Sequence, residues 1–460
     1  MGGFWDTIGH WNDGLQKILI GLVVMGLLVA VGVYLTIRTR GFQFTHFFDA
    51  FRKTLGSLFG GRKKQRSQNG VTPFQAVTTA LAGTMGTGNI VGVATAIVAG
   101  GPGAVLWMWV SAFFGMITKY AEVFLAVHFR EKDETGQNVG GPMYYLSRGL
   151  HSKWLAVIFA LFCALASFGI GNATQSNSIA QALDAAFHIP TVLTGIICAV
   201  LVGVVILGGV RRIAGVTEKI IPFISIVYIL GSVAALCINF RMIPDAFGLI
   251  FRYAFNFRAF GGGAAGYVLS NAIRYGFSRG IFSNEAGLGS APIAHGAADT
   301  DSPVRQGMWG IFEVFLDTIV VCTLTTLVIL TSGIWDCGLN GAALTTAAYG
   351  ASLGGYASIF IAVSTALFAF ATLVGWSYYG ERCVSYLFHN KRAVTIYRVI
   401  YVLVVFLGAV MELNLVWNLS DTLNGLMALP NLVGIVGLSP LVIRMTREYH
   451  KTGKLPPVKK

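Results

Sequence analysis

The chain has 460 residues, of which 55% are hydrophobic and only 12% are charged, and its formal net charge is +13. A soluble domain carries about 25% charged residues, so this composition argues against a soluble enzyme, a nucleic-acid-binding protein and a disordered chain. The six cysteines form no Cys-x-x-Cys pair and lie mostly in apolar stretches, which indicates neither a disulfide framework nor a metal site.

Eleven apolar stretches are each long enough to cross a bilayer, which takes about 20 residues. The first stretch is too long for the apolar part of a signal peptide and lacks a small-residue cleavage site, so we expect it to be a helix. A basic, aromatic loop follows it. The stretches are 14–37, 72–99, 103–127, 153–187, 190–207, 218–239, 263–294, 306–331, 356–387, 394–411 and 415–443.

The basic residues predict how the chain crosses the membrane. The loop after the first stretch holds the largest cluster of Lys and Arg, and alternate loops and the C-terminal tail hold most of the others. Cytoplasmic loops collect Lys and Arg, so we expect a multi-pass protein of the plasma (cell inner) membrane. Its N-terminus is expected outside and its C-terminus in the cytoplasm. This bias explains the net charge without a nucleic-acid partner. The opposite side has only Lys17, Arg241, Arg252 and Arg258.

The ten stretches after the first divide into two sets of five, and each set opens with a stretch interrupted by glycines, at 83–89 and at 276–287. An odd number of spans inverts the second set relative to the first. Paired glycine-interrupted helices at corresponding positions indicate a transporter binding site, whereas a single one would indicate close helix packing. The expected units are 1–70 (extra helix and basic cytoplasmic loop), 71–240 (first repeat), 241–262 (extracellular connection), 263–446 (second repeat) and 447–460 (cytoplasmic tail).

Interrupted helices have a chemical use inside a membrane. Non-helical backbone at that depth is tolerated only where it is buried in protein or lines a cavity. There the N-terminal ends of half-helices offer N–H groups to a carboxylate, and the freed carbonyls suit Na⁺. The two breaks therefore predict a site for a small anion-bearing substrate and a cation.

Three stretches carry a family resemblance: GGPGAVLWMWV at 100–110, GTGNIVGVATA at 86–96, and RGIFSNEAGLGSAP at 279–292. At these residues the sequence resembles the alanine or glycine:cation symporter family, the sodium:alanine symporters, with Leu106 where Phe is usual. The resemblance covers essentially the whole chain. It implies an all-α polytopic membrane protein of eleven transmembrane helices, with a LeuT-type five-plus-five inverted repeat and one extra N-terminal helix. It also implies sodium-coupled uptake of small neutral amino acids, alanine or glycine first, although some relatives are associated with glutamine.

The resemblance assigns roles at the first break. Asn89 is similar to the Asn that follows Gly in the equivalent helix of the wider fold, which puts Thr87 and Gly88 in the unwound turn that receives the substrate carboxylate. The same register makes the carbonyls of Ala82 and Met85 candidate sodium ligands. The alternative for Thr87 is a hydroxyl that simply bonds a carbonyl of its own helix.

A second set of sodium ligands is expected in the stretch 356–387. The spacing of Ala369 and Thr372 matches the carbonyl-plus-hydroxyl pattern of the fold's common sodium site, and oxygen ligands suit a hard cation. The fold often has a second hydroxyl next, where this chain has Leu373. Trp376, one turn beyond Thr372, is expected to wall the substrate site, with an interfacial belt as the alternative.

Two further groups of side chains are candidate substrate contacts. Asn172, with Asn177 second, lies in a polar run within the stretch 153–187, where the alternative is hydrogen bonding between helices. Phe277 and Phe282, at the second break, are candidate walls for a small side chain, where the alternative is ordinary packing.

Glu285 is an intramembrane carboxylate and is functional by default, unless it pairs with Arg279 or Arg274. Through it H⁺ remains possible as a coupling ion beside the expected Na⁺. Further charged residues of the apolar stretches are expected to pair between helices. These are Lys119, Glu122, Glu313 and Asp317.

No nucleophile–base pair, P-loop or metal quartet stands out, so we expect no enzyme, no catalytic residues and no organic cofactor. The expected partners are a small neutral amino acid and membrane lipid, and a monomer suffices because one chain holds both repeats. The rival class is an ion channel, because broken helices also line selectivity filters.

Overall fold

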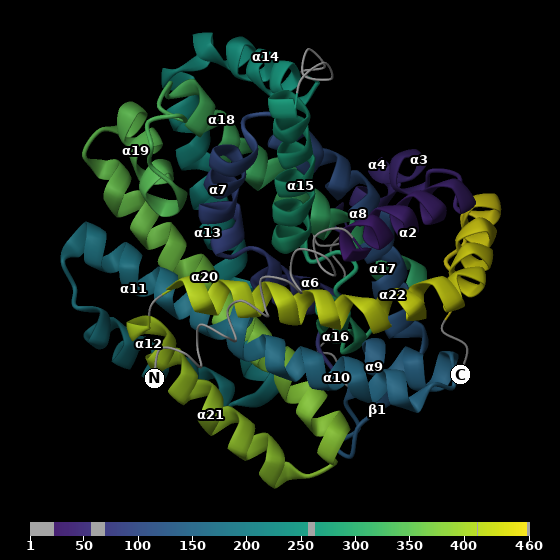
Figure 1. Cartoon of the computed structure of the whole chain (residues 1–460). Coiled ribbons are helices and arrows are strands. Elements are labelled where there is room, and N and C mark those ends of the chain that lie inside the picture. Colours follow the sequence, from purple (N-terminus) through teal and green to yellow (C-terminus); the bar gives the residue numbers. More distant parts are fainter. Residues whose placement is uncertain (1–22, 57–69, 256–262, 412, 458–460) are drawn as a thin grey trace.

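The computed structural model describes residues 23–56, 70–255, 263–411 and 413–457. This part of the chain is mostly helical (Figure 1), and its one short hairpin pairs β1 (Glu131–Lys132) with β2 (Asn138–Val139). Seven helical segments are long and apolar enough to cross a membrane. The composition therefore led to the right class, a helical membrane protein.

Helices occupy the predicted stretches of the N-terminal part and the first set of five. The segment 14–22 of the first stretch lies outside the described residues. The segments are α2 (Met25–Arg38), α3 (Phe42–Thr45), α4 (Phe47–Lys53), α6 (Pro73–Thr84), η2 (Thr87–Asn89), α7 (Val91–Gly100), α8 (Ala104–His128), α9 (Pro142–Tyr144), η3 (Tyr145–Gly149), α10 (Lys153–Phe168), η4 (Gly169–Ala173), α11 (Thr174–Phe187), α12 (Thr191–Ile206) and α13 (Gly209–Ile238).

The second set follows after a surface connection made of η5 (Phe240–Met242) and α14 (Ile243–Ala254). The short helix α19 has no counterpart among the predicted stretches. The segments are α15 (Gly263–Asn284), α16 (Ala291–Gly296), α17 (Pro303–Val314), η7 (Phe315–Cys322), α18 (Thr323–Thr331), α19 (Gly341–Leu353), α20 (Tyr356–Phe388), α21 (Lys391–Val410) and α22 (Leu413–Thr452).

The second break begins later than predicted. The helix α15 runs without interruption past Gly276 and Gly280, because both glycines lie against α8, where added side chains would collide with Ala104 and Ser111. The chain leaves the helix at Glu285, whose φ is 52°. It stays irregular through Gly287 and Gly289, which also have positive φ, until α16 begins. The earlier glycines thus serve close helix packing.

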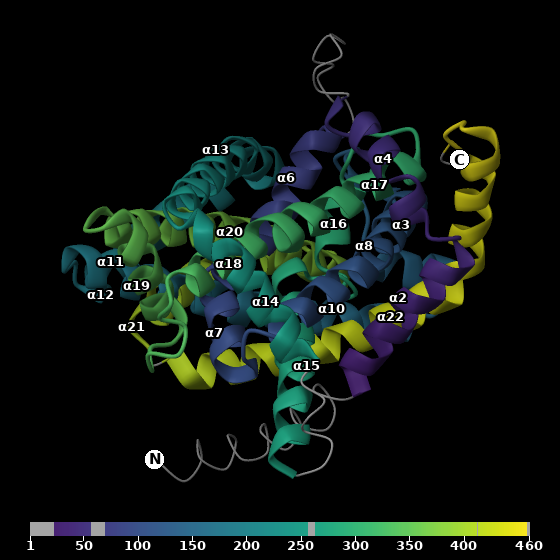
Figure 2. The ribbon, with the colours of Figure 1, turned by 90° about the horizontal axis from the view of Figure 1, so that it is seen from above.

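The helices pack around α8 and α20. The helix α8 contacts α15, α17 and α2, whereas α20 contacts α10, α11, α13 and α6. Figure 2 shows α2 lying beside α22 at the edge of the bundle. Large apolar side chains are exposed on the outer helices, for example Leu201 at 49%, Phe223 at 62% and Leu403 at 57%. So much exposed apolar surface suits contact with lipid and would be a liability in water.

One end of the bundle, which carries Arg38, Arg130, Arg382 and Arg447, is called the basic end below. There the residues flanking the two breaks are joined. Val71, just before α6, forms a parallel bridge with Ala298, just after α16, and the Asp299 N–H donates to the Val71 carbonyl at 2.8 Å. The Arg130 guanidinium donates to the carbonyl oxygens of Ala298 at 2.6 Å and Thr300 at 2.8 Å.

The hairpin β1–β2 is tied to the end of α20 by an ion pair between Asp133 and Arg382, with 3.2 Å between Oδ2 and Nη1. Burial alone would raise the pKa of Asp133, but hydrogen bonds from Thr135 and Gln137 and the nearby Arg382 charge outweigh it and hold the pKa below its usual value. The carboxylate therefore stays ionised and the pair persists at neutral pH.

Candidate functional site

The first break is built by strong start and stop signals. The helix α6 begins with a capping box in which the Thr72 hydroxyl accepts the Gln75 N–H and the Gln75 side chain accepts the Thr72 N–H, with Pro73 at the first helical position. It ends at Thr84. The Gly86 N–H then bonds the Thr84 carbonyl at 3.0 Å and the Asn89 side chain at 3.1 Å.

The Gly86 N–H does not make the hydrogen bond that would continue α6, and this leaves a carbonyl free at the end of the helix. In a continuous helix it would bond the carbonyl of Ala82, four residues earlier, but here it bonds Thr84 and Asn89 instead. Ala82 and Met85 are both buried. The carbonyl end of α6 is therefore directed at the break, as the candidate sodium ligands require.

The turn η2 holds the candidate carboxylate receptors. Thr87, Gly88 and Asn89 are all buried, and the Thr87 N–H donates to Gln175 Oε1 over a long 3.4 Å. The Thr87 hydroxyl has no hydrogen-bond partner among the described residues. A buried hydroxyl without a partner is costly, and this one makes no bond back to its own helix, so it is available to a ligand.

Gly88 is needed for close approach rather than for an unusual backbone angle. Its φ is not in the left-handed region. A Cβ built on it would lie 3.4 Å from both Phe282 Cδ1 and Ser283 Cα. The first break thus touches the last turn of α15, and any larger branched side chain would push the two apart.

Thr372 comes to the first break from α20. A Cβ on Gly86 would lie 2.7 Å from the Thr372 hydroxyl, and one on Gly375 would lie 3.3 Å from the Ala82 carbonyl carbon. The Thr372 hydroxyl donates to the Phe368 carbonyl at 3.1 Å, which leaves its lone pairs available to a cation. Ala369 is buried one turn before it. The donor set fits sodium, which takes oxygen ligands.

The predicted amide contacts lie elsewhere. Asn172 donates to the Tyr401 carbonyl at 2.8 Å, and Asn177 donates to the carbonyls of Gly408 at 3.0 Å and Met411 at 2.6 Å. The amide nitrogens of both side chains are therefore engaged with the backbone of α21 and its end, whereas both Oδ1 atoms are buried without a hydrogen-bond partner among the described residues. Gln175, in the same polar run, is the amide that reaches Thr87.

The aromatic candidates divide between the two breaks. Phe282 lies against Gly88, and the Arg279 guanidinium lies over its ring at 5.7 Å from the centroid. Phe277 lies more than one turn before Phe282 on α15, and its ring centroid is 6.0 Å from that of Trp107. No described contact joins Phe277 to the first break. Trp376 is wholly buried, which excludes the interfacial belt, and its indole N–H donates to Glu285 at 3.0 Å.

Asp317 connects the two breaks, a role that was not predicted from the sequence. Its carboxylate accepts from Asn89 at 2.7 Å and from the hydroxyls of Ser283 and Thr318 at 2.8 Å each. Asn89 belongs to the first break and Ser283 to the last turn before the second. Asp317 was expected to pair between helices, and its hydrogen bonds do so through neutral donors that join the two breaks. The available signal was its position inside an apolar stretch.

The other intramembrane charges form a buried network near the second break. Lys119 pairs with Glu313 at 3.2 Å, as predicted, and His295 Nε2 lies 3.0 Å from the other Glu313 oxygen. Glu122 accepts the Gly287 N–H at 3.1 Å. Glu285 was expected to be functional, with pairing to Arg279 or Arg274 as the alternative, and its carboxylate accepts from the Ser290 hydroxyl and from the Trp376 indole. These contacts hold the irregular backbone between α15 and α16.

A cavity of about 840 Å³ opens beside α19 and the first turns of α20. It is lined by α7, α11, α15, α19, α20 and α22, and it reaches Val91 and Gly92, directly after the first break. Arg279 also lines it and covers Phe282. Arg279 and Phe282 therefore link the wall of this cavity to Gly88 of η2. Figure 1 shows the two broken helices α7 and α15 running side by side beneath α14.

The sequence matches the sodium:alanine symporter family over residues 5–458. A sodium/alanine symporter, AgcS of Methanococcus maripaludis, is 46% identical over 444 residues, which cover 94% of this chain and 95% of that protein. A probable sodium/glutamine symporter, GlnT of Bacillus subtilis, is 38% identical over 455 residues, which cover 98% of this chain and 92% of that protein.

Among solved structures, MhsT in complex with L-phenylalanine superposes with a TM-score of 0.57 at 15% identity, over 83% of this chain and 90% of that chain. At this identity the likeness concerns the fold alone. It agrees with the LeuT-type architecture that the sequence predicted.

Proposed function

The chain belongs to the sodium:alanine symporter family, and we propose from this membership and from the first break that it imports small neutral amino acids, alanine and glycine first, together with Na⁺. The single observation that carries the proposal is the buried, unpartnered Thr87 hydroxyl at an interrupted helix, with the Thr372 hydroxyl beside the same turn. A glutamine preference is the alternative, favoured by the more distant GlnT.

Sodium is expected to take the carbonyls of Ala82, Met85 and Ala369 and the hydroxyl of Thr372. These atoms come from the end of α6 and from α20, so a bound cation joins the two helices and orders the turn between them. Because Thr87 and Gly88 belong to that turn, ordering it lowers the cost of binding the amino acid. The coupling is reciprocal, so the amino acid tightens sodium by the same factor.

The amino-acid carboxylate is expected at the N–H groups of Thr87 and Gly88. Gln175 holds the Thr87 N–H over 3.4 Å, which is a weak bond that a charged carboxylate displaces. The contact of Gly88 with Phe282 limits the space beside the turn. A hydrogen atom or a methyl group is therefore expected to fit there better than a long side chain.

The finer membrane arrangement is part of the same proposal. We propose eleven spans, namely the helix containing α2 followed by two inverted sets of five, with the unit boundaries given by the sequence. The protein lies in the plasma membrane. Its N-terminus is outside the cell, and the basic end faces the cytoplasm. One chain transports without a partner chain.

Alternating access follows from the two ends. The large cavity leads toward the first break from outside, while the bridge between Val71 and Ala298, clamped by Arg130, closes the basic end. Release into the cytoplasm requires these backbone bonds to break. The proposed inward step is therefore a movement of the two broken helices together.

An uptake panel in proteoliposomes tests the function. Alanine, glycine and glutamine are each offered with and without an inward sodium gradient. Saturable, sodium-dependent uptake of alanine or glycine, in competition with each other, is the expected result. Sodium-dependent uptake of glutamine alone would favour the alternative substrate, and non-saturable sodium current without uptake would favour a channel and overturn the proposal.

Replacing Thr372 by alanine is expected to raise the sodium concentration for half-maximal uptake by about 5- to 30-fold, because one oxygen ligand is worth about 1–2 kcal/mol. Thr372→Ser keeps the hydroxyl and should restore the wild-type value. The control is Ser377→Ala on the same helix, whose hydroxyl bonds the Val374 carbonyl. An unchanged sodium dependence in folded Thr372→Ala would remove Thr372 from the site.

Replacing Gln175 by glutamate is expected to weaken amino-acid binding by about tenfold or more, because a carboxylate beside Thr87 repels the substrate carboxylate in a water-poor site. Isothermal titration with alanine at saturating sodium measures the effect. Gln181→Glu makes the same change on α11 where it lines the wide cavity. Equal affinities in both variants would show that the carboxylate does not bind beside Gln175.

A further inference from the structure

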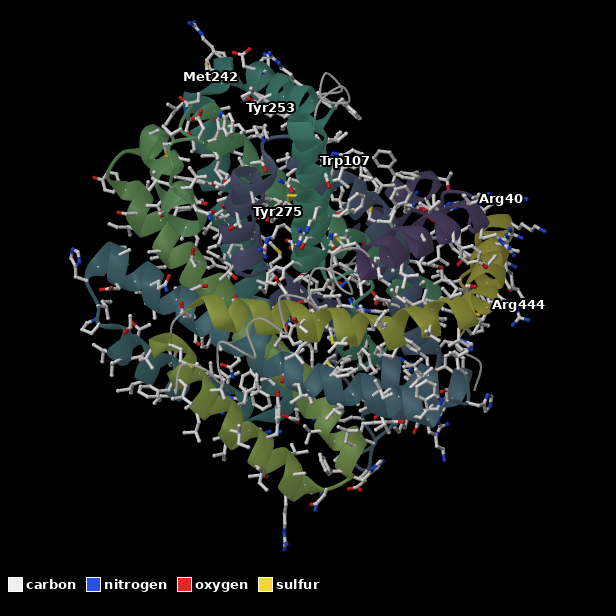
Figure 3. All side chains as sticks on the ribbon, in the orientation of Figure 1. Arg40, Trp107, Met242, Tyr253, Tyr275 and Arg444 are labelled. Atoms are coloured by element: carbon white, nitrogen blue, oxygen red, sulfur yellow. The ribbon has the colours of Figure 1, made fainter. Side chains whose placement is uncertain are left out.

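At the basic end, a hollow of about 490 Å³ lies between the end of α2 and the last turns of α22. Four cationic side chains line it, Arg38, Arg444, Arg447 and Lys451, together with the carboxylate of Glu448. All four are exposed. Figure 3 shows the neighbouring Arg40 and Arg444 projecting from the same edge of the molecule.

The hollow is held open by contacts that do not consume its charge. The Tyr34 hydroxyl bonds Ser439 at 3.2 Å, and the Arg447 guanidinium donates to the Arg38 carbonyl at 3.1 and 2.9 Å. These bonds fix the end of α2 against α22. In the described part of the chain, no carboxylate oxygen lies within 4.0 Å of a nitrogen of the four cationic side chains.

Along one stripe on the outer face of α22, the exposed side chains change from apolar to cationic. Val433 and Val436 are exposed by 50% and 47%, although they are apolar. Beyond them the helix presents cations. Residues three and four apart lie on one helix face, and the stripe is formed by Val433, Val436, Pro440, Arg444, Arg447 and Lys451.

A lipid has the same order of parts, an apolar chain followed by a charged head. Ile37, exposed by 69%, adds apolar surface on α2 directly before Arg38. Arg forms paired hydrogen bonds with phosphate oxygens, and basic clusters directly outside a membrane-spanning helix recognise anionic lipids. A soluble phosphate would use the cations but not the apolar part of the stripe.

We propose that the groove between α2 and α22 binds one anionic glycerophospholipid. Its phosphodiester lies among Arg38, Arg444, Arg447 and Lys451, and its acyl chains lie along Val433 and Val436. The lipid phosphate reduces the net positive charge that remains after Glu448 is counted against the four cations, and the lipid joins α2 to the last helix. The proposal concerns a lipid site and does not depend on which amino acid is carried.

The test measures thermal unfolding of the full-length, delipidated protein in detergent with defined additions. Phosphatidylglycerol is expected to raise the melting temperature by several degrees, whereas phosphatidylcholine with the same acyl chains and inorganic phosphate are not. Native mass spectrometry of the same samples should show one retained phosphatidylglycerol. Equal effects of phosphatidylglycerol and phosphatidylcholine, or an equal effect of inorganic phosphate, would overturn the proposal.

The double variant Arg444→Gln/Lys451→Gln removes two charges whose side chains make no described hydrogen bond, and it leaves Arg447 and its bonds intact. It is expected to weaken phosphatidylglycerol binding by about tenfold or more, since each cation near an anionic headgroup contributes about 1 kcal/mol. Lys391→Gln/Arg392→Gln is the matched control, because it removes two exposed cations from the start of α21. Equal loss in both variants would show nonspecific attraction and contradict a site.

Discussion

Gly86→Ala is expected to abolish sodium-dependent uptake while leaving the protein folded. The new Cβ would lie 2.7 Å from the Thr372 hydroxyl and 3.2 Å from Gln175 Oε1. Both atoms end rotatable side chains, so the fold yields by turning them away. Thr has two accessible rotamers in a helix. That rotation removes a proposed sodium ligand and disturbs the amide that holds Thr87.

Uptake in proteoliposomes and sodium-induced thermal stabilisation of purified Gly86→Ala measure this loss. The control is Gly92→Ala in α7, where an added Cβ meets no atom within 4 Å. It should transport like the wild type. Normal sodium stabilisation of Gly86→Ala would place the ion elsewhere, and a large drop in melting temperature without sodium would make Gly86 a purely structural residue.

Asp317→Asn is expected to reduce transport to a few per cent of the wild type or less, an effect of about 2 kcal/mol or more. The carboxylate accepts the Asn89 amide and two hydroxyls. An amide offers one oxygen in place of two and adds donors where donors already converge. The link between the first break and the last turn of α15 is therefore lost, although the side chain keeps its volume.

Initial rates over a range of alanine and sodium concentrations test Asp317→Asn, because a residue that positions both breaks should lower the maximal rate and both affinities. Cys322→Ala is the control, because its sulfur lies 3.4 Å from the Asn89 amide in the same cluster and forms only weak hydrogen bonds. Wild-type rates in Asp317→Asn, or equal losses in both variants, would contradict the positioning role.

The helical class and the first break could be read from the sequence because their causes are local. Apolar length predicts a membrane helix, and the run from Gly83 to Asn89 contains Gly86, just after the end of α6 at Thr84, and the Asn89 side chain that accepts the Gly86 N–H. The second break could not be placed in the same way. In the sequence, Gly276 and Gly280 resemble helix breaks. In the structure they are small because they pack against α8, a contact between distant parts of the chain that local sequence does not show.

The amide that contacts the first break could not be identified from the sequence, for a related reason. Asn172 and Gln175 share a face in a regular α-helix. The segment η4 is π-helical and ends at Ala173, and the wider turn shifts the register of everything after it. Asn172 therefore meets α21 while Gln175 meets Thr87. Asp317 also lies in a π-helical segment, η7, so its partners could not be inferred from α-helical spacing.

The bridge between Val71 and Ala298 has a consequence for leakage. Of the two breaks, sodium is proposed to touch only the first, together with α20, whereas the amino acid is proposed to lie between the first break and Phe282 of α15. If the first broken helix opened alone at the basic end, sodium could be released without the amino acid. This slippage would dissipate the sodium gradient without transport. The bridge joins the chain before α6 to the chain after α16. Under the proposed mechanism, neither broken helix opens without the other, so ion and amino acid leave in a fixed ratio.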